Sequence, residues 1–170
     1  MQARRIVAWR QQWEPNRARL WIEQFVTLEG TVRDRVTTEV VITDRHMSGR
    51  GRTTSLRLTW LTADPLAVHL VLTAMPDHPS LPRGMWVVLR DFLQYGLEEP
   101  TGDGAVRIRP EPGRDRVRLD LARDCGDCWV TVAAGVVRDF LATTEELVAS
   151  GEERGGEELD TLIARLLVGE

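Results

Sequence analysis

The chain has 170 residues and a formal net charge of −4, and its 22 basic residues are all arginine. A chain of this length fits one domain and buries roughly 70% of the surface that its unfolded form would expose, so it needs no metal or disulfide to hold a core. The acidic balance argues against a dedicated nucleic-acid-binding protein, which usually carries a basic excess. No apolar run approaches the ~20 residues of a membrane span, and the N-terminal apolar run is too short for a signal peptide, so we expect a cytoplasmic protein.

Residues 1–36 are expected to form an N-terminal arm, and residues 37–170 the main domain. The arm contains an apolar stripe with helical spacing, formed by Trp21, Phe25 and Leu28, which predicts a helix. The run from Leu20 to Leu28 also fits a strand, and this alternative stays open at the level of sequence.

Tryptophans are the most prominent side chains of the arm. They stand at Trp9, Trp13 and Trp21. One interpretation is that the arm simply packs on the main domain. The other is that it binds a partner through these tryptophans, because large exposed apolar side chains usually mark an interaction site.

The main domain is expected to begin with three strands. Thr37–Met47 is rich in β-branched residues and has no helix or strand breaker, and Leu56–Leu61 alternates apolar and polar residues. Asp64-Pro65 is a turn signal, because proline fixes φ and aspartate can bond the backbone ahead of it. Ala67–Ala74 then returns as the next strand, which predicts an antiparallel hairpin.

The middle of the chain changes from strand to helix and back. Met85–Leu89 is predicted as a strand, and apolar residues from Arg90 to Leu97 fall at helical intervals. Gly96 and Pro100 limit this helix to about two turns. Three further strands are predicted, at Ala105–Arg109, Arg116–Ala122 and Trp129–Ala133.

Two helices are predicted at the C-terminal end. The first has an apolar stripe of Val136, Val137, Phe140 and Leu141, and the second a stripe of Leu159, Leu162, Ile163, Leu166 and Leu167. Ser150–Gly156 is interpreted as a hinge between them. This order of elements predicts an α+β domain, in which a largely antiparallel sheet carries a short inserted helix and is packed against the C-terminal helices.

Residues that could carry chemistry are few. Cys125 and Cys128 form a CxxC pair, but strands flank it, whereas a redox CxxC normally stands at a helix N-terminus. A structural zinc site needs four ligands, and the chain has no second CxxC or HxxxH motif. The three histidines are scattered, so no nucleophile, base and orienting group can be assembled from local spacing. We therefore expect no enzyme, no metal and no cofactor.

A set of residues in the middle of the chain follows an order and spacing that resemble those of the SsgA-like sporulation and cell division proteins of actinobacteria. The set runs from an Asp-Pro pair, through a Trp-x-x-x-Arg-Asp strand-to-helix junction, to a Pro-x-Gly-x-Gly turn. Its members are Asp64, Pro65, Trp86, Arg90, Asp91, Gly96, Pro100, Gly102, Gly104, Arg107 and Pro110. Each has a structural duty in a turn, strand or helix start, so we expect these residues to be mainly structural. For Arg90 and Asp91, this means an intramolecular ion pair and a helix-start carboxylate.

The resemblance implies a Whirly-like fold that assembles as a homotrimer. It also implies a non-catalytic regulator or adaptor of sporulation-type septation, which helps to place the division septum through protein contacts. The implied partners are SsgA-like paralogues and the division protein FtsZ, which the SsgA–SsgB system recruits. The expected location is the cytoplasm, at division septa.

The alternative function is binding of single-stranded nucleic acid, which other Whirly folds perform with a basic groove and stacking aromatic side chains. The arginines that could form such a groove are Arg50, Arg52, Arg107, Arg109, Arg114, Arg116 and Arg118. The acidic net charge of the chain argues against this alternative.

Overall fold

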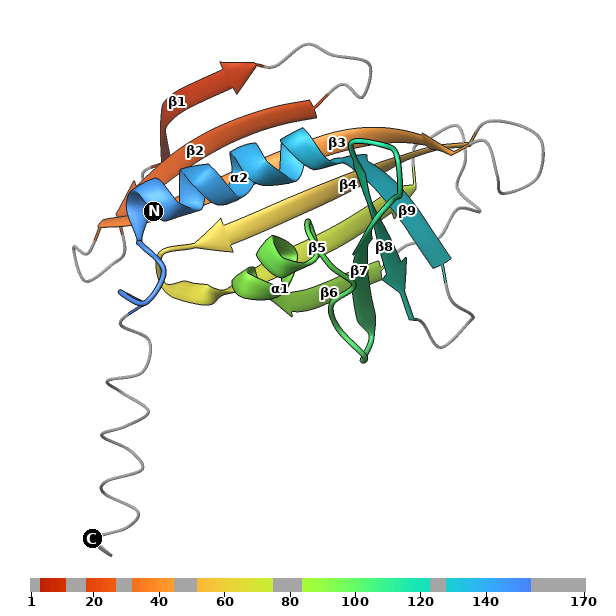
Figure 1. The fold of residues 1–170 in the computed structure, drawn as a ribbon. Coiled ribbons are helices and arrows are strands. Elements are labelled where there is room, and N and C mark those ends of the chain that lie inside the picture. The colour runs from red at the N-terminus through yellow and green to blue at the C-terminus, as the bar shows by residue number, and fades with distance from the viewer. Residues whose placement is uncertain are drawn as a thin grey trace, which may run out of the picture.

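The computed structural model describes residues 4–11, 18–26, 32–44, 52–74, 84–122 and 128–153. Within these stretches the backbone forms nine strands and two helices, and the strands make two antiparallel sheets (Figure 1). The predicted α+β class is confirmed. The expectation of one sheet is wrong, because the strands that follow the short helix pair only with one another and form a sheet of their own.

The larger sheet, sheet A, is a six-stranded meander in which each strand pairs with the next one in sequence. Its strands are β1 (Arg4–Gln11), β2 (Ala18–Val26), β3 (Val32–Asp44), β4 (Arg52–Leu61), β5 (Asp64–Ala74) and β6 (Gly84–Leu89). The last four correspond to the four strands predicted between residues 37 and 89. Among the described residues, β1 and β6 are the two edges of the sheet.

The helix predicted for the N-terminal segment is wrong, and the strand alternative for the run that begins at Leu20 is correct. Both β1 and β2 are strands, and β2 pairs with β3 in register over its whole length, from Ala18 opposite Val40 to Val26 opposite Val32. The edge of β3 offers nine residues of ladder hydrogen bonding, and this tertiary pairing overrides a helical spacing that is only three apolar residues long. The proposed division of the chain at residue 36 falls within β3.

The hairpin between β4 and β5 was predicted, but its turn lies two residues earlier than Asp64-Pro65. Thr62 and Ala63 form the turn, and Asp64 begins β5 opposite Leu61. Proline has no N–H for a ladder bond, so the start of a strand is one of the few positions in a sheet that accept it. The carbonyl oxygen of Pro65 also accepts a 2.8 Å hydrogen bond from Nε1 of Trp60, which ties the turn to the core.

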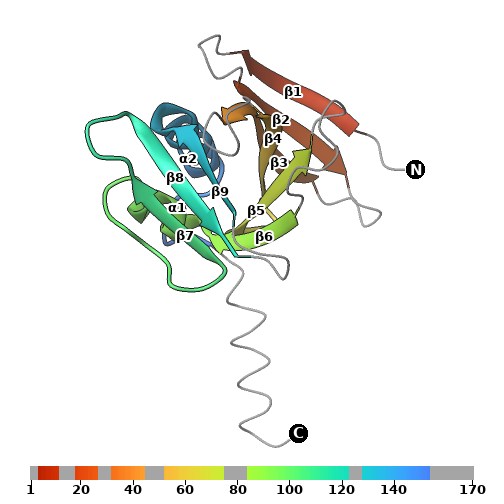
Figure 2. The ribbon, with the colours of Figure 1, turned by 90° about the vertical axis from the view of Figure 1, so that its right-hand side faces the viewer.

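The smaller sheet, sheet B, contains the last three predicted strands in sequence order, as β7 (Val106–Pro110), β8 (Arg116–Leu121) and β9 (Cys128–Ala133). Helix α1 (Arg90–Tyr95) connects β6 to sheet B, and helix α2 (Ala134–Leu147) follows β9. Sheet B and α2 lie on the same side of sheet A (Figure 2). Helix α2 contacts β3, β8 and β9, and α1 contacts β5, β6 and α2.

The hydrophobic core lies between the two sheets and beneath the helices. The strands of sheet B contribute to this core by alternation, because every second residue of β7, β8 and β9 points inward. The largest side chains that are fully buried are Trp60, Phe140, Leu56, Leu58, Leu70, Leu93, Ile108, Leu119 and Leu121. The stripe predicted on α2 is only partly correct, since Val137, Phe140 and Leu141 are buried while Val136 is half-buried. The second C-terminal helix, predicted around residues 159–167, lies outside the described residues.

Candidate interaction surfaces

Trp86 joins the two sheets. Its side chain is buried, and its Nε1 donates a 2.9 Å hydrogen bond to the carbonyl oxygen of Ala122, just past the end of β8. The ring lies over Gly84, where an added Cβ would stand 2.3 Å from the nearest ring carbon. Gly84 therefore has to be a glycine for the ring to reach sheet B, and the role of Trp86 is structural.

Arg90 is buried at the start of α1 and binds the segment that follows α2. Its side chain is 3% exposed, and Nη1 donates a 2.8 Å hydrogen bond to the carbonyl oxygen of Val148. Nη2 makes an ion pair with Glu153 and lies 3.9 Å from a carboxylate oxygen of Glu145. Arg90 thus forms an intramolecular ion pair, with carboxylates remote in sequence. The neighbouring Asp91 is exposed in the first turn of α1.

The two carboxylates beside Arg90 are stabilised in their charged form. Hydrogen bonds from the backbone N–H and hydroxyl of Ser150, together with the charge of Arg90, hold the pKa of Glu145 below its ordinary value of 4.5. Burial raises the pKa of Glu153. Hydrogen bonds from its own backbone N–H and that of Gly151, with the charge of Arg90, outweigh the burial and leave this pKa lowered as well.

The predicted turn from Pro100 to Gly104 is present. Thr101 and Ile108 exchange two backbone hydrogen bonds of 2.8 Å, so the turn covers part of the outer edge of β7. Gly102 has a φ of +88°, and an added Cβ there would lie 2.4 Å from the carbonyl oxygen of Val106. At Gly96 an added Cβ would lie 2.2 Å from Cγ2 of Ile108, so this glycine lets the end of α1 pack closely on β7.

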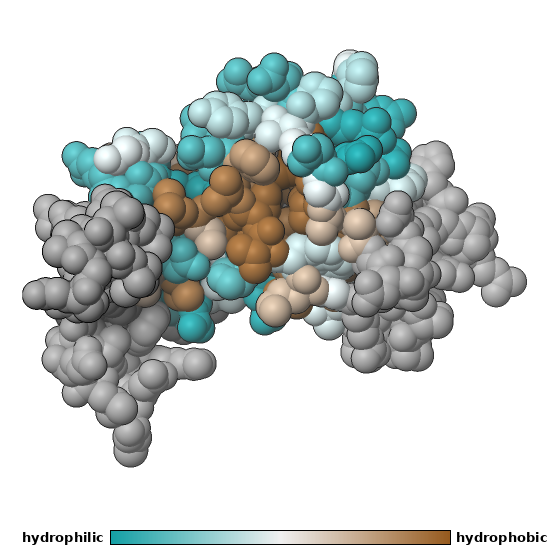
Figure 3. Space-filling view, turned by 90° about the horizontal axis from the view of Figure 1, so that it is seen from below, coloured by the Kyte–Doolittle hydropathy of each residue, from teal (hydrophilic) through white to brown (hydrophobic). Residues whose placement is uncertain are grey.

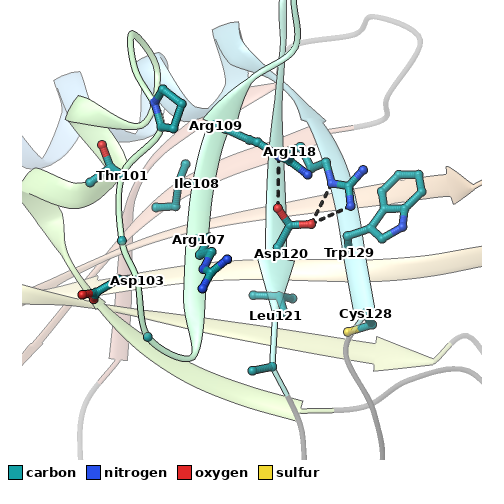
Figure 4. A pocket seen from close by; sticks show the side chains of 14 residues that line it. Thr101, Asp103, Arg107, Ile108, Arg109, Arg118, Asp120, Leu121, Cys128 and Trp129 are labelled. Carbon is teal, nitrogen blue, oxygen red and sulfur yellow. Dashed lines mark hydrogen bonds and ion pairs between the residues drawn. The ribbon is translucent and has the colours of Figure 1, made fainter.

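The outer side of sheet B carries a cluster that we call the arginine face, formed by Arg107, Arg109, Arg118, Asp120 and Trp129. Asp120 accepts from Nε of Arg109 at 3.2 Å and from Arg118 at 2.7 Å, and the guanidinium of Arg118 lies 4.2 Å from the centroid of the Trp129 ring (Figure 4). These residues and the Pro100–Gly104 turn line a cavity of about 670 Å³. The sequence placed some of these arginines in a hypothetical basic groove. It did not give the position of Asp120 between them.

A second surface was missed by the sequence reasoning. Large apolar side chains are exposed on β6, on α1 and at the start of β5, and we call this set the apolar face. Its members are Leu66, Met85, Val87, Leu89, Phe92 and Tyr95. Figure 3 views the molecule from this side and shows brown, hydrophobic residues gathered in the middle of it. The signal in the sequence was apolar residues at both inward and outward positions of Met85–Leu89, which marks a strand that is apolar on both faces.

The candidate tryptophans of the N-terminal segment are only partly described. Trp9 of β1 stands directly opposite Trp21 of β2 in the register of the hairpin, and Trp21 is half-buried. Trp13 lies outside the described residues. The structure therefore brings two of the three predicted positions together.

The residues considered for metal or redox chemistry do not form a described site. Cys128 is buried at the start of β9, and Cys125 lies outside the described residues. His69 is half-buried in β5. Over the described stretches, no group of three or more His, Cys, Asp or Glu side chains is placed to hold a metal ion. No helix found in those stretches is both long and apolar enough to span a membrane.

The fold and the surfaces define an α+β protein of two antiparallel sheets that presents one apolar and one arginine-rich face. Comparison with known proteins identifies the family and supports the fold. The family described as "Streptomyces sporulation and cell division protein, SsgA" matches residues 54–153, which run from β4 to Glu153.

Curated relatives point to the same family. The chain is 33% identical over 139 residues to the sporulation-specific cell division protein SsgB of Kineococcus radiotolerans, covering 79% of this chain and 81% of that protein. It is 33% identical over 112 residues to SsgB of Streptomyces coelicolor, covering 65% of this chain and 79% of that protein.

Solved structures show the same fold. A structure described as "Mutations in SsgB correlate to longitudinal cell division during sporulation of Streptomyces coelicolor" superposes with a TM-score of 0.61 at 28% identity, over 71% of this chain and 94% of that one. The SsgA-like sporulation-specific cell division protein of Thermobifida fusca superposes with a TM-score of 0.59 at 25% identity, over 77% and 94% of the two chains. The chain belongs to the SsgA-like family of sporulation and cell division proteins. It is accordingly a cell division protein and not an enzyme, as the sequence predicted.

Proposed function

We propose that this protein is an adaptor that helps to place the septum in sporulation-type division through protein–protein contacts. The observation that carries the proposal is the apolar face. Met85 is 69% exposed, Val87 56% and Leu89 48%, on consecutive outward positions of one strand. Contiguous exposed apolar patches on a folded domain usually mark a site of protein association.

The geometry of β6 supports association through this face. Within the described residues β6 is an edge of sheet A, so its outer backbone groups have no partner strand there. Its outward residues stand opposite Ala67, His69 and Val71 of β5, which are half-buried. A partner seated on the apolar face would therefore cover two strands of sheet A as well as α1.

We assign to this adaptor the finer properties that the family resemblance implies. It assembles as a homotrimer, acts in the cytoplasm at division septa, and contacts SsgA-like paralogues and FtsZ as part of FtsZ recruitment. The motif residues from Asp64 to Pro110 hold the fold, and Trp9, Trp13 and Trp21 of the N-terminal segment supply a further partner contact. Family membership supports these assignments.

The test combines one variant with one control. Val87→Glu places a charge in the middle of the apolar face, and Ala142→Glu places the same charge at an exposed position of α2. Purified FtsZ and family paralogues are captured on the immobilised protein, and the solution mass is measured by light scattering. A fluorescent fusion expressed in the native cell reports on location.

We expect the parent and Ala142→Glu proteins to form trimers, to capture FtsZ or a paralogue, and to gather at septa. Val87→Glu is expected to lose at least one of the two associations while its circular dichroism spectrum stays unchanged. A monomeric parent that captures none of these partners and spreads evenly through the cell would overturn the proposal.

A further inference from the structure

The arginine face concentrates positive charge on a chain whose net charge is −4. Cross-strand register builds it, since Arg107 stands opposite Asp120 and Arg109 stands opposite Arg118. Three arginine side chains therefore share this face with one carboxylate, that of Asp120, which pairs with Arg109 and Arg118. Asp103 lies on the turn that borders the same cavity and adds one further carboxylate at its rim (Figure 4).

Two of these guanidinium groups have donors to spare. Arg107 is exposed, and across the described stretches it makes no hydrogen bond or ion pair. Arg109 is 48% exposed and uses only Nε toward Asp120, which leaves its two terminal nitrogens unengaged by described residues. Both side chains stand on the outer side of β7, because the intervening Ile108 is buried.

We infer that the arginine face binds an acidic protein segment in extended conformation, with carboxylates at alternate positions. Residues two apart on a strand repeat every ~7 Å, so Arg107 and Arg109 present guanidinium groups at the spacing of alternate side chains in an extended peptide. A guanidinium fork matches a carboxylate in shape and charge. Asp120 already shows this recognition within the face, as one carboxylate held by two arginines.

The segment is held by side chains and not by addition of a strand. The outer edge of β7 is closed at Ile108, whose N–H and carbonyl are both bonded to Thr101. The incoming carboxylates instead enter the cavity between the turn and sheet B. Its volume of about 670 Å³ is sufficient for several side chains.

Two observations favour an acidic peptide over a single-stranded nucleic acid. Binding of bases needs an open aromatic ring to stack on, and Arg118 lies over the ring of Trp129 at 4.2 Å. A nucleic acid strand also extends beyond one face and would meet a protein that is acidic as a whole. A short acidic segment meets the arginine face alone.

The inference goes beyond the proposed function, because it concerns a different face of the molecule, and its test is independent. The full chain is titrated into a fluorescein-labelled peptide of alternating glutamate and glycine, and binding is followed by anisotropy. A peptide with glutamine in place of glutamate and a labelled oligothymidylate are titrated in parallel. The variants are Arg107→Gln with Arg109→Gln, and the control is Arg138→Gln, an exposed arginine of α2.

We expect the glutamate peptide to bind and the glutamine peptide to bind at least about tenfold more weakly, since charge-assisted hydrogen bonds are lost. The double variant should lose a similar factor, while Arg138→Gln and the apolar-face variant Val87→Glu should bind as the parent does. Circular dichroism checks that each variant is folded.

Equal binding of the two peptides, or unchanged binding by the folded double variant, would overturn the inference. Tighter binding of oligothymidylate than of the glutamate peptide would overturn it in favour of a nucleic-acid site. A loss of partner capture by Val87→Glu with peptide binding intact would separate the two faces.

Discussion

Arg90 and Glu153 stand 63 residues apart in the sequence and form an ion pair between the start of α1 and the segment after α2. The arginine side chain is 3% exposed and the glutamate side chain 10%. The same guanidinium binds the carbonyl oxygen of Val148 and lies over the ring of Trp60, 5.8 Å from its centroid. One side chain therefore fixes the position of residues 148–153 against the body of the domain.

Replacement of this arginine should weaken the fold. Arg90→Ala leaves the carbonyl of Val148 and the carboxylate of Glu153 without their donor, and we expect the free energy of unfolding to fall by about 3 kcal/mol. Urea denaturation followed by circular dichroism measures it. Arg138→Ala removes an exposed arginine from an exposed ion pair, so its cost should stay below about 1 kcal/mol. Equal losses in the two variants would contradict a structural role for Arg90.

The same cluster should make stability depend on acid pH. The pKa values of Glu145 and Glu153 are lowered in the folded state, so both carboxylates favour folding above their unfolded value of about 4.5. This contribution is lost as the pH falls below 4.5 and through the folded pKa values. Glu153→Gln should therefore be less stable than the parent at neutral pH, and the two unfolding free energies should converge below pH 4.5.

The convergence is measured by denaturant unfolding at a series of pH values. Glu146→Gln removes an exposed carboxylate in the last turn of α2 that is in no ion pair with a described residue, and it controls for the loss of one charge. A Glu153→Gln deficit that stays constant down to pH 3 would show that the ion pair does not stabilise the fold.

The ion pair between Arg90 and Glu153 was predictable from the sequence only in part. The strand-to-helix change at Arg90 could be predicted, because the apolar spacing lengthens there from two residues to three and four. The arginine could be expected to make an internal pair. Its partner could not be identified, because Glu153 is one of several acidic residues near the C-terminal end and only the folded backbone brings it to Arg90.

Two glycines should respond to alanine with opposite signs. Gly96→Ala places a methyl group 2.2 Å from Cγ2 of Ile108 and 2.9 Å from the carbonyl oxygen of Phe92, so it should cost about 2 kcal/mol. At Gly135 in the first turn of α2, an added Cβ meets no atom within 4 Å. Gly135→Ala should stabilise the protein by about 0.5 kcal/mol through helix propensity. Thermal and urea unfolding of both variants measure the sign of the change in the free energy of unfolding. A Gly96→Ala protein as stable as the parent would contradict the close packing of α1 on β7.

The connection between the two sheets can be tested at Trp86. Trp86→Phe removes the donor to the carbonyl oxygen of Ala122 and reduces the volume in the core, so it should cost about 2 kcal/mol. Trp129→Phe, on the half-buried outer side of sheet B, should cost less than about 1 kcal/mol. The unfolding free energies are compared in urea. A larger loss at Trp129 would contradict the role of Trp86 as the contact between sheets.

Sequence pattern gave the strands of sheet B and the last four strands of sheet A, since alternation is a local property. It left β2 open between helix and strand, and the ladder with β3 decided the conformation. It did not locate the apolar face. Met85, Val87 and Leu89 are apolar in the same way as their buried neighbours, and it is their exposure in the described part of the structure that identifies them as a surface.

The adjacent valines of β6 separate association from folding. Val87 is 56% exposed on the apolar face, whereas Val88 is 6% exposed in the core. Val87→Ser should change the free energy of unfolding of the monomer by less than about 0.5 kcal/mol, because it alters a surface position. Val88→Ala should cost about 2 kcal/mol by leaving a small cavity between the sheets. Light scattering over a range of protein concentrations should show weaker self-association for Val87→Ser and unchanged self-association for folded Val88→Ala. If Val87→Ser associates as tightly as the parent, the interface between copies lies on another face of the molecule.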